Sequence, residues 1–458
     1  MMRGTSMEGE SRRVPLSGGG SGPGGNQISL QDPQEVPVCG ALAERFRAVR
    51  GASERHCAPL EPEDYCIQPM ADASPPKWHL AHVTWFFETF LLKPFVADYA
   101  PFHSRFEYLF NSYYNGVGRL YPRAHRGLLS RPTTREIIEY RRHVDRAMLC
   151  LLGERADEDA IAFRTELGLH HEQQHQELFF TDMKYNLGNN PLHPLYVEGP
   201  ASLEEVPEAA PLDFVRCDGG VREIGFCGEG FHFDNEGPRH EVLVRDYALA
   251  NRPVTNGEFL DFLEDGGYTR SELWLSDGWA TINEAGIGAP LYWYRDDGEW
   301  FEYHLDGARP LQRSAPVCHV SGYEAAAYAR WAGARLPSEP EWELAATMPP
   351  ADGNFVESGL FRPRAANVEP VRSASVPRAP AGMFGDVWEW TSSSYAPYPG
   401  FSEFEGSLGE YNGKFMANQL VLRGGSCVTP ASHIRATYRN FFYPKDRWQF
   451  TGIRLARD

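Results

Sequence analysis

The sequence predicts an α+β protein of two domains, a helical bundle followed by a loop-rich α+β domain. The 458 residues, at about 150 per domain, predict two or three domains. Apolar residues recur at helical spacing through the first half, whereas from about residue 205 short strand-like runs alternate with Gly, Pro and Asp turns. Hydrophobic residues make up 42% of the chain, enough to build a sizeable core.

Composition sets the domain boundaries. Residues 1–37 are rich in Gly, Ser, Pro and charge, so they cannot bury enough apolar surface to offset their ordering entropy, and we expect a disordered tail without catalytic content. Residues 38–195 are expected to form the bundle and residues 205–458 the second domain. Residues 190–210, which contain four prolines, are the expected linker.

Four stretches predict the long helices of the bundle. The second follows Ser74-Pro75-Pro76, because proline is favoured in a first helical turn. The third opens at Thr133 or Thr134, with Glu136 as a capping partner. The fourth ends at Gly188, a typical helix stop. The four stretches are residues 39–51, 77–92, 133–152 and 157–187.

The segment between the second and third helices, residues 93–132, is too long for a plain bundle connection. It contains Pro, Gly and many aromatic residues, so we expect a functional loop. In the second domain, residues 241–244 predict a strand, and residues 257–264 and 322–332 predict short helices.

Charge and cysteine content exclude several classes of protein. The 44 basic and 62 acidic residues give a net charge of −18, which argues against nucleic acid or an anionic membrane as partner. We find neither an apolar run long enough to span a membrane nor an apolar signal region after Arg12-Arg13. The 8 cysteines are scattered without a CxxC motif, so we expect reduced thiols and a cytoplasmic protein.

The strongest chemical signal is HHEQQHQE at residues 170–177. His171 and His175 lie one helical turn apart and can grip one metal ion. HEQQH also matches HExxH, in which Glu172 would be the general base of a zinc protease, but a bundle helix is the wrong setting for that site. Glu177 is expected to accept a hydrogen bond near the site or to be a charge on the helix face, rather than to bind metal.

A third ligand lies upstream, where His79 and His82 are three residues apart and either could turn inward. Three neutral imidazoles with open positions suit iron, zinc, copper or nickel, and ligand chemistry alone does not choose among them. The alternative is that these histidines hold no metal and that the chain is a binding or scaffold protein.

A second signal is Asn111-Ser112-Tyr113-Tyr114-Asn115 in the aromatic loop. These tyrosines could be ordinary packing residues. In the functional interpretation one phenol lines the metal site and donates a proton, since a phenol with a pKa near 10 is protonated at neutral pH.

Further motifs in the second half contain tight turns, tryptophans and charges that must be paired when buried. They resemble landmarks of the formylglycine-generating-enzyme fold, a C-type-lectin-like α+β domain, whereas the first half resembles a DinB-like four-helix bundle with a histidine metal site. In this order the two halves resemble the ergothioneine-biosynthesis sulfoxide synthases. The motifs are residues 316–321 (PVCHVS), 335–343 (RLPSEPEWE), 385–391 (GDVWEWT) and 423–426 (RGGS).

The resemblance implies a nonhaem Fe(II) enzyme that uses O2. Such an enzyme joins a thiol sulfur to C2 of the imidazole of hercynine (Nα-trimethylhistidine) and oxidises that sulfur to a sulfoxide. It implies that the iron ligands are His82, His171 and His175, which sets His79 aside. Gln174 matches a residue that contacts the hercynine imidazole, and Asn440 one that contacts its carboxylate.

One departure from the family bears on the thiol. Members that use γ-glutamylcysteine have Trp-Asp after the Arg-Asn pair, where this chain has Phe441 and Phe442. The loop with Tyr113 and Tyr114 instead resembles the branch that takes free cysteine and keeps its acid tyrosines there, so we expect cysteine as the donor. The trimethylammonium group could be held by cation–π contact with an aromatic residue. The candidates are Phe441, Phe442, Trp448 and Trp85.

Close relatives remain as alternatives. Selenoneine synthases share this architecture with a selenosugar donor, and 5-histidylcysteine sulfoxide synthases attack a different imidazole carbon of unmethylated histidine. Formylglycine generation is disfavoured, because it needs a cysteine pair after the GGS segment and only Cys427 is present there.

Overall fold

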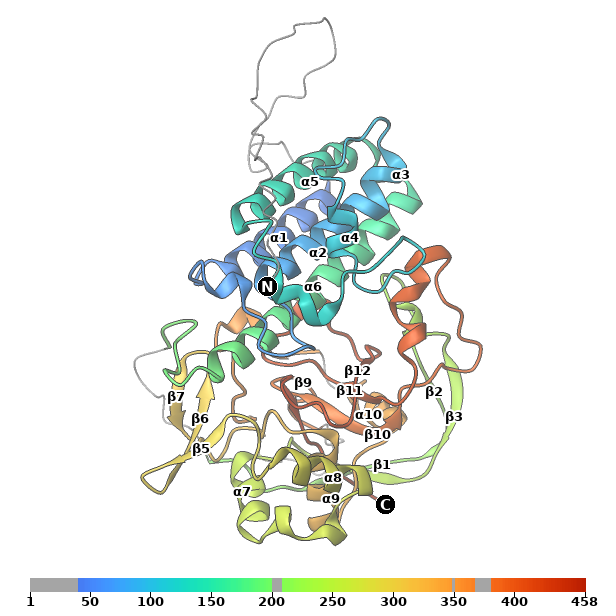
Figure 1. Cartoon of the computed structure of the whole chain (residues 1–458). Coiled ribbons are helices and arrows are strands. Elements are labelled where there is room, and N and C mark those ends of the chain that lie inside the picture. Colours follow the sequence, from blue (N-terminus) through green and yellow to red (C-terminus); the bar gives the residue numbers. More distant parts are fainter. Residues whose placement is uncertain (1–39, 200–207, 348–350, 367–379) are drawn as a thin grey trace, which may run out of the picture.

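The computed structural model describes residues 40–199, 208–347, 351–366 and 380–458. The predicted tail at residues 1–37 lies outside these ranges, as does part of the predicted linker. The predicted two-domain α+β architecture is confirmed: a helical bundle stands on a second domain of small sheets, short helices and long loops (Figure 1).

Four long helices form the bundle, as predicted, and its capping signal is confirmed, since Thr133 and Glu136 make a reciprocal capping box at the start of α5. α2 continues through a π-helical segment at Glu88–Leu92 into the short α3, which the apolar pattern did not predict. The loop before α5 contains α4. The helices are α1 Ala41–Cys57, α2 Pro76–Phe87, α3 Lys93–Phe95, α4 Phe106–Phe110, α5 Thr134–Arg155 and α6 Asp159–Gly188.

The second domain is built around a sheet of order β12-β11-β10-β13, in which only the β10–β13 pair is parallel. Smaller sheets are β1-β4-β14, β2-β3, β5-β6-β7 and β8-β9. The strands are β1 Phe214–Cys217, β2 Gly220–Ile224, β3 His240–Val244, β4 Tyr247–Ala250, β5 Trp293–Asp296, β6 Glu299–His304, β7 Gly307–Pro310, β8 Gly353–Asn354, β9 Phe384–Gly385, β10 Trp388–Ser394, β11 Leu420–Arg423, β12 Asn440–Phe442, β13 Thr451–Gly452 and β14 Ala456–Arg457. The helices are α7 Asn256–Glu264, α8 Ser276–Ala285, α9 Gly322–Trp331 and α10 Glu339–Ala346.

Charges in the second-domain motifs are paired inside the core, as their burial requires. Arg423 of the RGGS motif donates to Glu339 and to Glu343 of α10, each at 2.8 Å. Glu389 of β10 accepts from Arg454 at 2.8 Å and from the Trp342 indole at 2.6 Å. These motif residues therefore hold the scaffold together.

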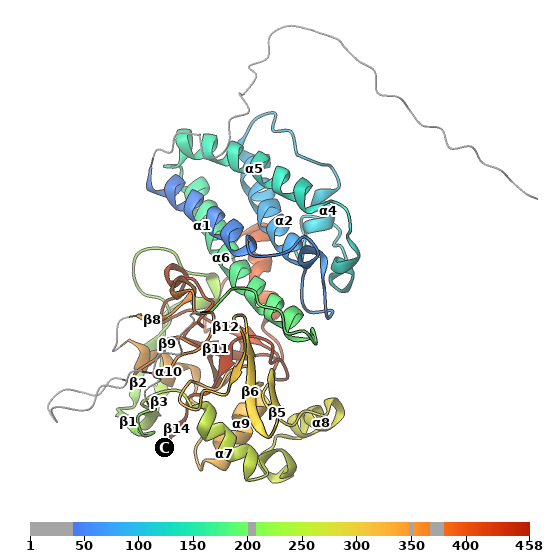
Figure 2. The ribbon, with the colours of Figure 1, turned by 90° about the vertical axis from the view of Figure 1, so that its left-hand side faces the viewer.

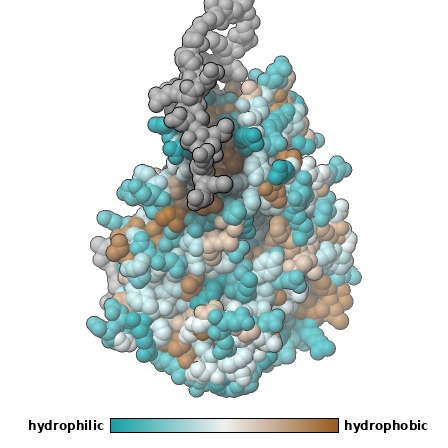
Figure 3. All heavy atoms as spheres, viewed as in Figure 1, coloured by the Kyte–Doolittle hydropathy of each residue, from teal (hydrophilic) through white to brown (hydrophobic). Residues whose placement is uncertain are grey.

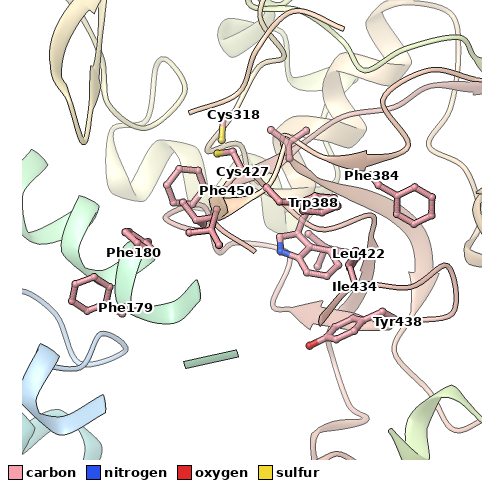
Figure 4. Packing of buried hydrophobic residues seen from close by; sticks show 14 of the residues in the cluster. Phe179, Phe180, Cys318, Phe384, Trp388, Leu422, Cys427, Ile434, Tyr438 and Phe450 are labelled. Atoms are coloured by element: carbon pink, nitrogen blue, oxygen red, sulfur yellow. The ribbon is translucent and has the colours of Figure 1, made fainter. Parts of the chain in front are cut away.

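α6 joins the two domains. It runs from the bundle down to the second domain, and the view turned by 90° shows the same arrangement (Figure 2). Phe179 and Phe180 lie on this helix, and Trp388 and Tyr438, whose rings are 5.5 Å apart, lie in the second domain; all four belong to one cluster of buried hydrophobic residues (Figure 4). The visible outer surface is largely hydrophilic, with scattered hydrophobic residues (Figure 3). The border between the domains is thus part of the core.

Candidate metal centre

Three histidines from two helices converge inside the bundle. α2 supplies His82, and α6 supplies His171 and His175. One ring nitrogen from each lies within 4.8 Å of the other two, and the ring centroids are 4.7–4.9 Å apart. Within the described ranges this is the only such group of three metal-binding side chains.

The histidine nitrogens suit a divalent metal. The Nδ1 of His82 must donate to the Phe110 carbonyl at 2.6 Å. Its Nε2 therefore has a free lone pair and lies 3.2 Å from Nε2 of His171. Burial lowers the pKa of His82 and His175 well below the usual value and lowers that of His171 to about 3. The imidazoles are therefore neutral, the state in which they bind metal.

His79, the other histidine of α2, lies behind this group. Its Nδ1 is 2.8 Å from Nδ1 of His175, and its Nε2 is 3.1 Å from a carboxylate oxygen of Asp182. His79 is thus a hydrogen-bond partner of His175.

Glu172, which completes the HExxH match, points into the bundle instead of toward the three histidines. It accepts hydrogen bonds from Ser53 and Arg141, both at 2.6 Å, and from Arg50 at 2.9 Å. A carboxylate saturated by two guanidinium groups cannot serve as a general base. The resemblance to a zinc protease is therefore one of sequence only.

Glu177 accepts hydrogen bonds, as expected, but its donors belong to the second domain. They are the indole of Trp388 and the hydroxyl of Thr429, the latter at 2.6 Å. This carboxylate joins α6 to the β10 sheet and the loop after RGGS.

Gln174 is also fixed from across the domain border. Its amide donates to the hydroxyl of Tyr438, which lies 3.0 Å from Nε2 of His433. Nδ1 of His433 is in turn 2.9 Å from Nδ1 of His170 on α6. Gln174 therefore has a defined orientation next to His175.

The loop tyrosines reach the site through a third tyrosine that sequence reasoning missed. Tyr113 and Tyr114 stack with their centroids 4.6 Å apart, and Tyr113 lies 6.2 Å from Tyr411. Tyr411 packs edge-on against His171 at 5.5 Å. Burial raises the pKa of all three phenols, so they stay protonated, and the hydroxyls of Tyr114 and Tyr411 have no hydrogen-bond partner among the described residues.

Residues 440–442 lie at the edge of the main sheet, in β12. Asn440 accepts a hydrogen bond from the Phe441 backbone through its side chain. The ring of Phe441 stacks on that of Tyr395, with centroids 4.0 Å apart. The Phe415 ring lies near both Phe441 and Tyr113, with centroid distances of 6.0 Å and 5.3 Å.

The remaining aromatic candidates lie in different places. Trp85 is fully buried and stacks on His82 at 5.5 Å, so it supports a ligand from within the bundle. Trp448 lines an open pocket between the second domain and the end of α6, and Phe442 is half-buried in β12. Neither has a ring contact with the three histidines in the described ranges.

A buried arginine was also missed. The Arg126 guanidinium lies 3.3 Å from the centre of the Trp78 ring, which stacks on His82 at 4.7 Å. Arg126 is only 5% exposed and donates to the Ser74 hydroxyl, but its Nε has no partner and it forms no ion pair in the described part of the chain. Its position in the predicted functional loop was the only sequence signal.

Both halves match known families. Residues 45–179 match the DinB superfamily, and residues 200–458 match the sulfatase-modifying factor enzyme 1-like domain. The chain is 35% identical over 409 residues to the hercynine oxygenase of Mycolicibacterium thermoresistibile, covering 84% of this chain and 87% of that protein. The chain belongs to the hercynine oxygenase family.

Other relatives agree with this assignment. The hercynine oxygenase of Mycolicibacterium smegmatis is 36% identical over 320 residues, covering 66% of this chain and 73% of that protein. A formylglycine-generating enzyme of Streptomyces coelicolor is 29% identical over 300 residues, covering 56% of this chain and 94% of that enzyme. Hercynine oxygenases thus match across both domains. No helix in the described ranges has the length and apolar character needed to cross a membrane.

Proposed function

We propose that this chain is an Fe(II)- and O2-dependent sulfoxide synthase that joins the sulfur of cysteine to C2 of hercynine. The observation that carries the proposal is the buried three-imidazole group in a chain of the hercynine oxygenase family. His82, His171 and His175 would hold the iron. When bound, Fe(II) supplies open coordination positions for the substrates and the redox chemistry with O2.

Gln174 and residues of β12 would hold hercynine. The Gln174 amide, fixed by Tyr438, presents a polar group beside His175 that can hydrogen-bond to an imidazole. Asn440 would contact the substrate carboxylate. Phe441 and Phe442 offer ring faces to the trimethylammonium group, with Trp85 and Trp448 as the other candidates.

Arg126 would hold the carboxylate of cysteine. Burial lowers the pKa of the Arg126 guanidinium, and the nearby charge of Asp182 offsets this only in part. A guanidinium buried without an ion pair is costly, and an anionic ligand would reduce that cost. The Arg126 guanidinium stacks on Trp78, which itself stacks on His82, so a single indole ring separates this charge from a proposed iron ligand. The neutral pair Phe441 and Phe442 supports cysteine over γ-glutamylcysteine, because neither side chain can pair with the ammonium group of the glutamyl part.

Tyr113 and Tyr114 would hold the proton that the reaction needs. Burial keeps both phenols protonated, and the unpartnered hydroxyl of Tyr114 is free to donate. In this proposal that proton directs the reaction toward sulfoxide formation and away from simple oxidation of the thiol. Free thiols at the seven described cysteines support a cytoplasmic location for the enzyme.

The test is anaerobic loading with Fe(II), addition of hercynine, cysteine and O2, and mass spectrometry of the product. We expect a product equal to hercynine plus cysteine plus one oxygen minus two hydrogens, and none from a His171→Ala variant. Products only with a selenosugar, or only with unmethylated histidine, would support selenoneine synthase or 5-histidylcysteine sulfoxide synthase. Preference for γ-glutamylcysteine would refute the proposed donor, and failure to bind any metal would leave a scaffold protein.

A further inference from the structure

The three histidines of the metal centre differ in what lies behind them. The Nδ1 of His82 donates to a backbone carbonyl, and the Nδ1 of His171 has no partner in the described ranges. The Nδ1 of His175 instead faces His79, which in turn contacts Asp182. His79 is 5% exposed and Asp182 is 6% exposed, so both side chains are buried.

The contacts from Asp182 through His79 to His175 form a relay, and the donors and acceptors along it determine its direction. One oxygen of Asp182 accepts the backbone N–H of Ser74 at 2.8 Å and also contacts Nε2 of His79. Because a carboxylate only accepts, Nε2 of His79 must carry a hydrogen, and in the imidazole tautomer with its hydrogen there Nδ1 is an acceptor. The Nδ1 of His175 must therefore carry the donated hydrogen, and its Nε2 is left bare.

We propose that His79 and Asp182 are positioning residues of the metal centre. They hold His175 in the tautomer whose Nε2 binds metal, fix the orientation of its ring and increase its strength as a ligand. The inference rests on the metal centre of the proposed function but not on any substrate. Partners of this kind behind a ligand histidine generally strengthen metal binding.

The placement of the relay on the helices supports this role. His79 precedes His82 by one turn of α2, and Asp182 follows His175 by two turns of α6. The relay thus links the same two helices that the metal would bridge. A cavity of about 20 Å³ beside His79 and His175 has room for about one water molecule.

The test is calorimetric titration of the metal-free full-length chain with Co(II), with the Co(II) absorption spectrum as a second readout. His79→Leu and Asp182→Ala should weaken Co(II) binding by about 10–100-fold and change the spectrum. His79→Gln should stay close to the parent, because an amide can both accept from His175 and donate to Asp182. Asp182→Asn keeps an acceptor but loses the charge, so a smaller loss is expected.

Asp145→Asn is the matched control. Asp145 is equally buried in the bundle but pairs with Arg50 and touches none of the three histidines, so its loss should lower stability and leave Co(II) affinity unchanged. Parent-like affinity in both His79→Leu and Asp182→Ala would overturn the proposal, as would an equal loss in Asp145→Asn. Metal binding without sulfoxide formation would instead count against the proposed function alone.

Discussion

Replacing Glu172 with alanine should destabilise the bundle rather than remove a catalytic base. Its carboxylate is fully buried and accepts hydrogen bonds from Arg50, Arg141 and Ser53. Removing one partner of such a buried charge network costs about 3–5 kcal/mol, because two guanidinium groups lose their counter-ion. The variant should therefore unfold at a lower temperature.

The pKa of Glu172 gives a second measure of the same effect. Burial raises it, but Arg141 and Arg50 outweigh burial and lower it from 4.5 to about 2. At about 1.4 kcal/mol for each pH unit, this difference corresponds to about 3 kcal/mol. Because the folded pKa is the lower one, this stability is present above about pH 4.5 and is lost as the pH falls toward 2. Glu172→Gln should lack that part of the acid dependence.

The assay is thermal unfolding of the metal-free protein, followed by circular dichroism. For a domain of this size 1 kcal/mol shifts the midpoint by about 2–4 °C, so Glu172→Ala should lower it by about 6–20 °C. Glu166 is the control: it lies on the same helix in an ion pair with Arg45 that is about one-third exposed, and Glu166→Gln should shift the midpoint little. A Glu172→Ala variant with an unchanged melting temperature and abolished activity would refute this reasoning and would indicate that Glu172 is a general base.

Three further predictions concern the proposed chemistry. Tyr114→Phe should reduce sulfoxide formation by at least about 100-fold and increase oxidised cysteine, measured by product analysis, whereas Tyr108→Phe in the same loop should not. Arg126→Met should raise the KM for cysteine by about 30-fold or more, as expected for losing a buried charge pair, and an unchanged KM would exclude the carboxylate contact. Phe442→Asp should raise kcat/KM for γ-glutamylcysteine relative to cysteine, and an unchanged ratio would show that this position does not select the donor.

Much of the fold could be predicted because its signals are local. Helical periodicity located the four long helices, and the Thr133 cap followed from the residues around it. The π segment at Glu88–Leu92 was missed, because a run that is buried on nearly every side has no periodicity to mark a change of winding. The sheet order of the second domain could not be predicted either, since it depends on pairing between strands that are distant in the sequence.

The site was only partly predictable for the same reason. Helical spacing brought His171 and His175 together, but spacing left His79 and His82 equivalent. Their difference lies in tertiary contacts: His82 is fixed by the Phe110 carbonyl, whereas His79 lies behind His175. Arg126 and Tyr411 approach the histidines from loops that no local pattern ties to the site.

The polar residues of α6 determine both where the histidines lie and where the two domains meet. A helix repeats every 3.6 residues, so its 30 residues present several stripes, and on this helix three of them carry polar groups with separate partners. One stripe faces α2, one faces the buried arginine network of the bundle, and one faces the second domain. The stripes are His171, His175 and Asp182; Glu172 and Gln176; and His170, Gln174 and Glu177. Because hydrogen bonds occupy all three, a helix that is polar in sequence is buried in the structure. The histidine pair and the domain border are therefore set by the same helix orientation, and rotating α6 to improve one contact would break the other two.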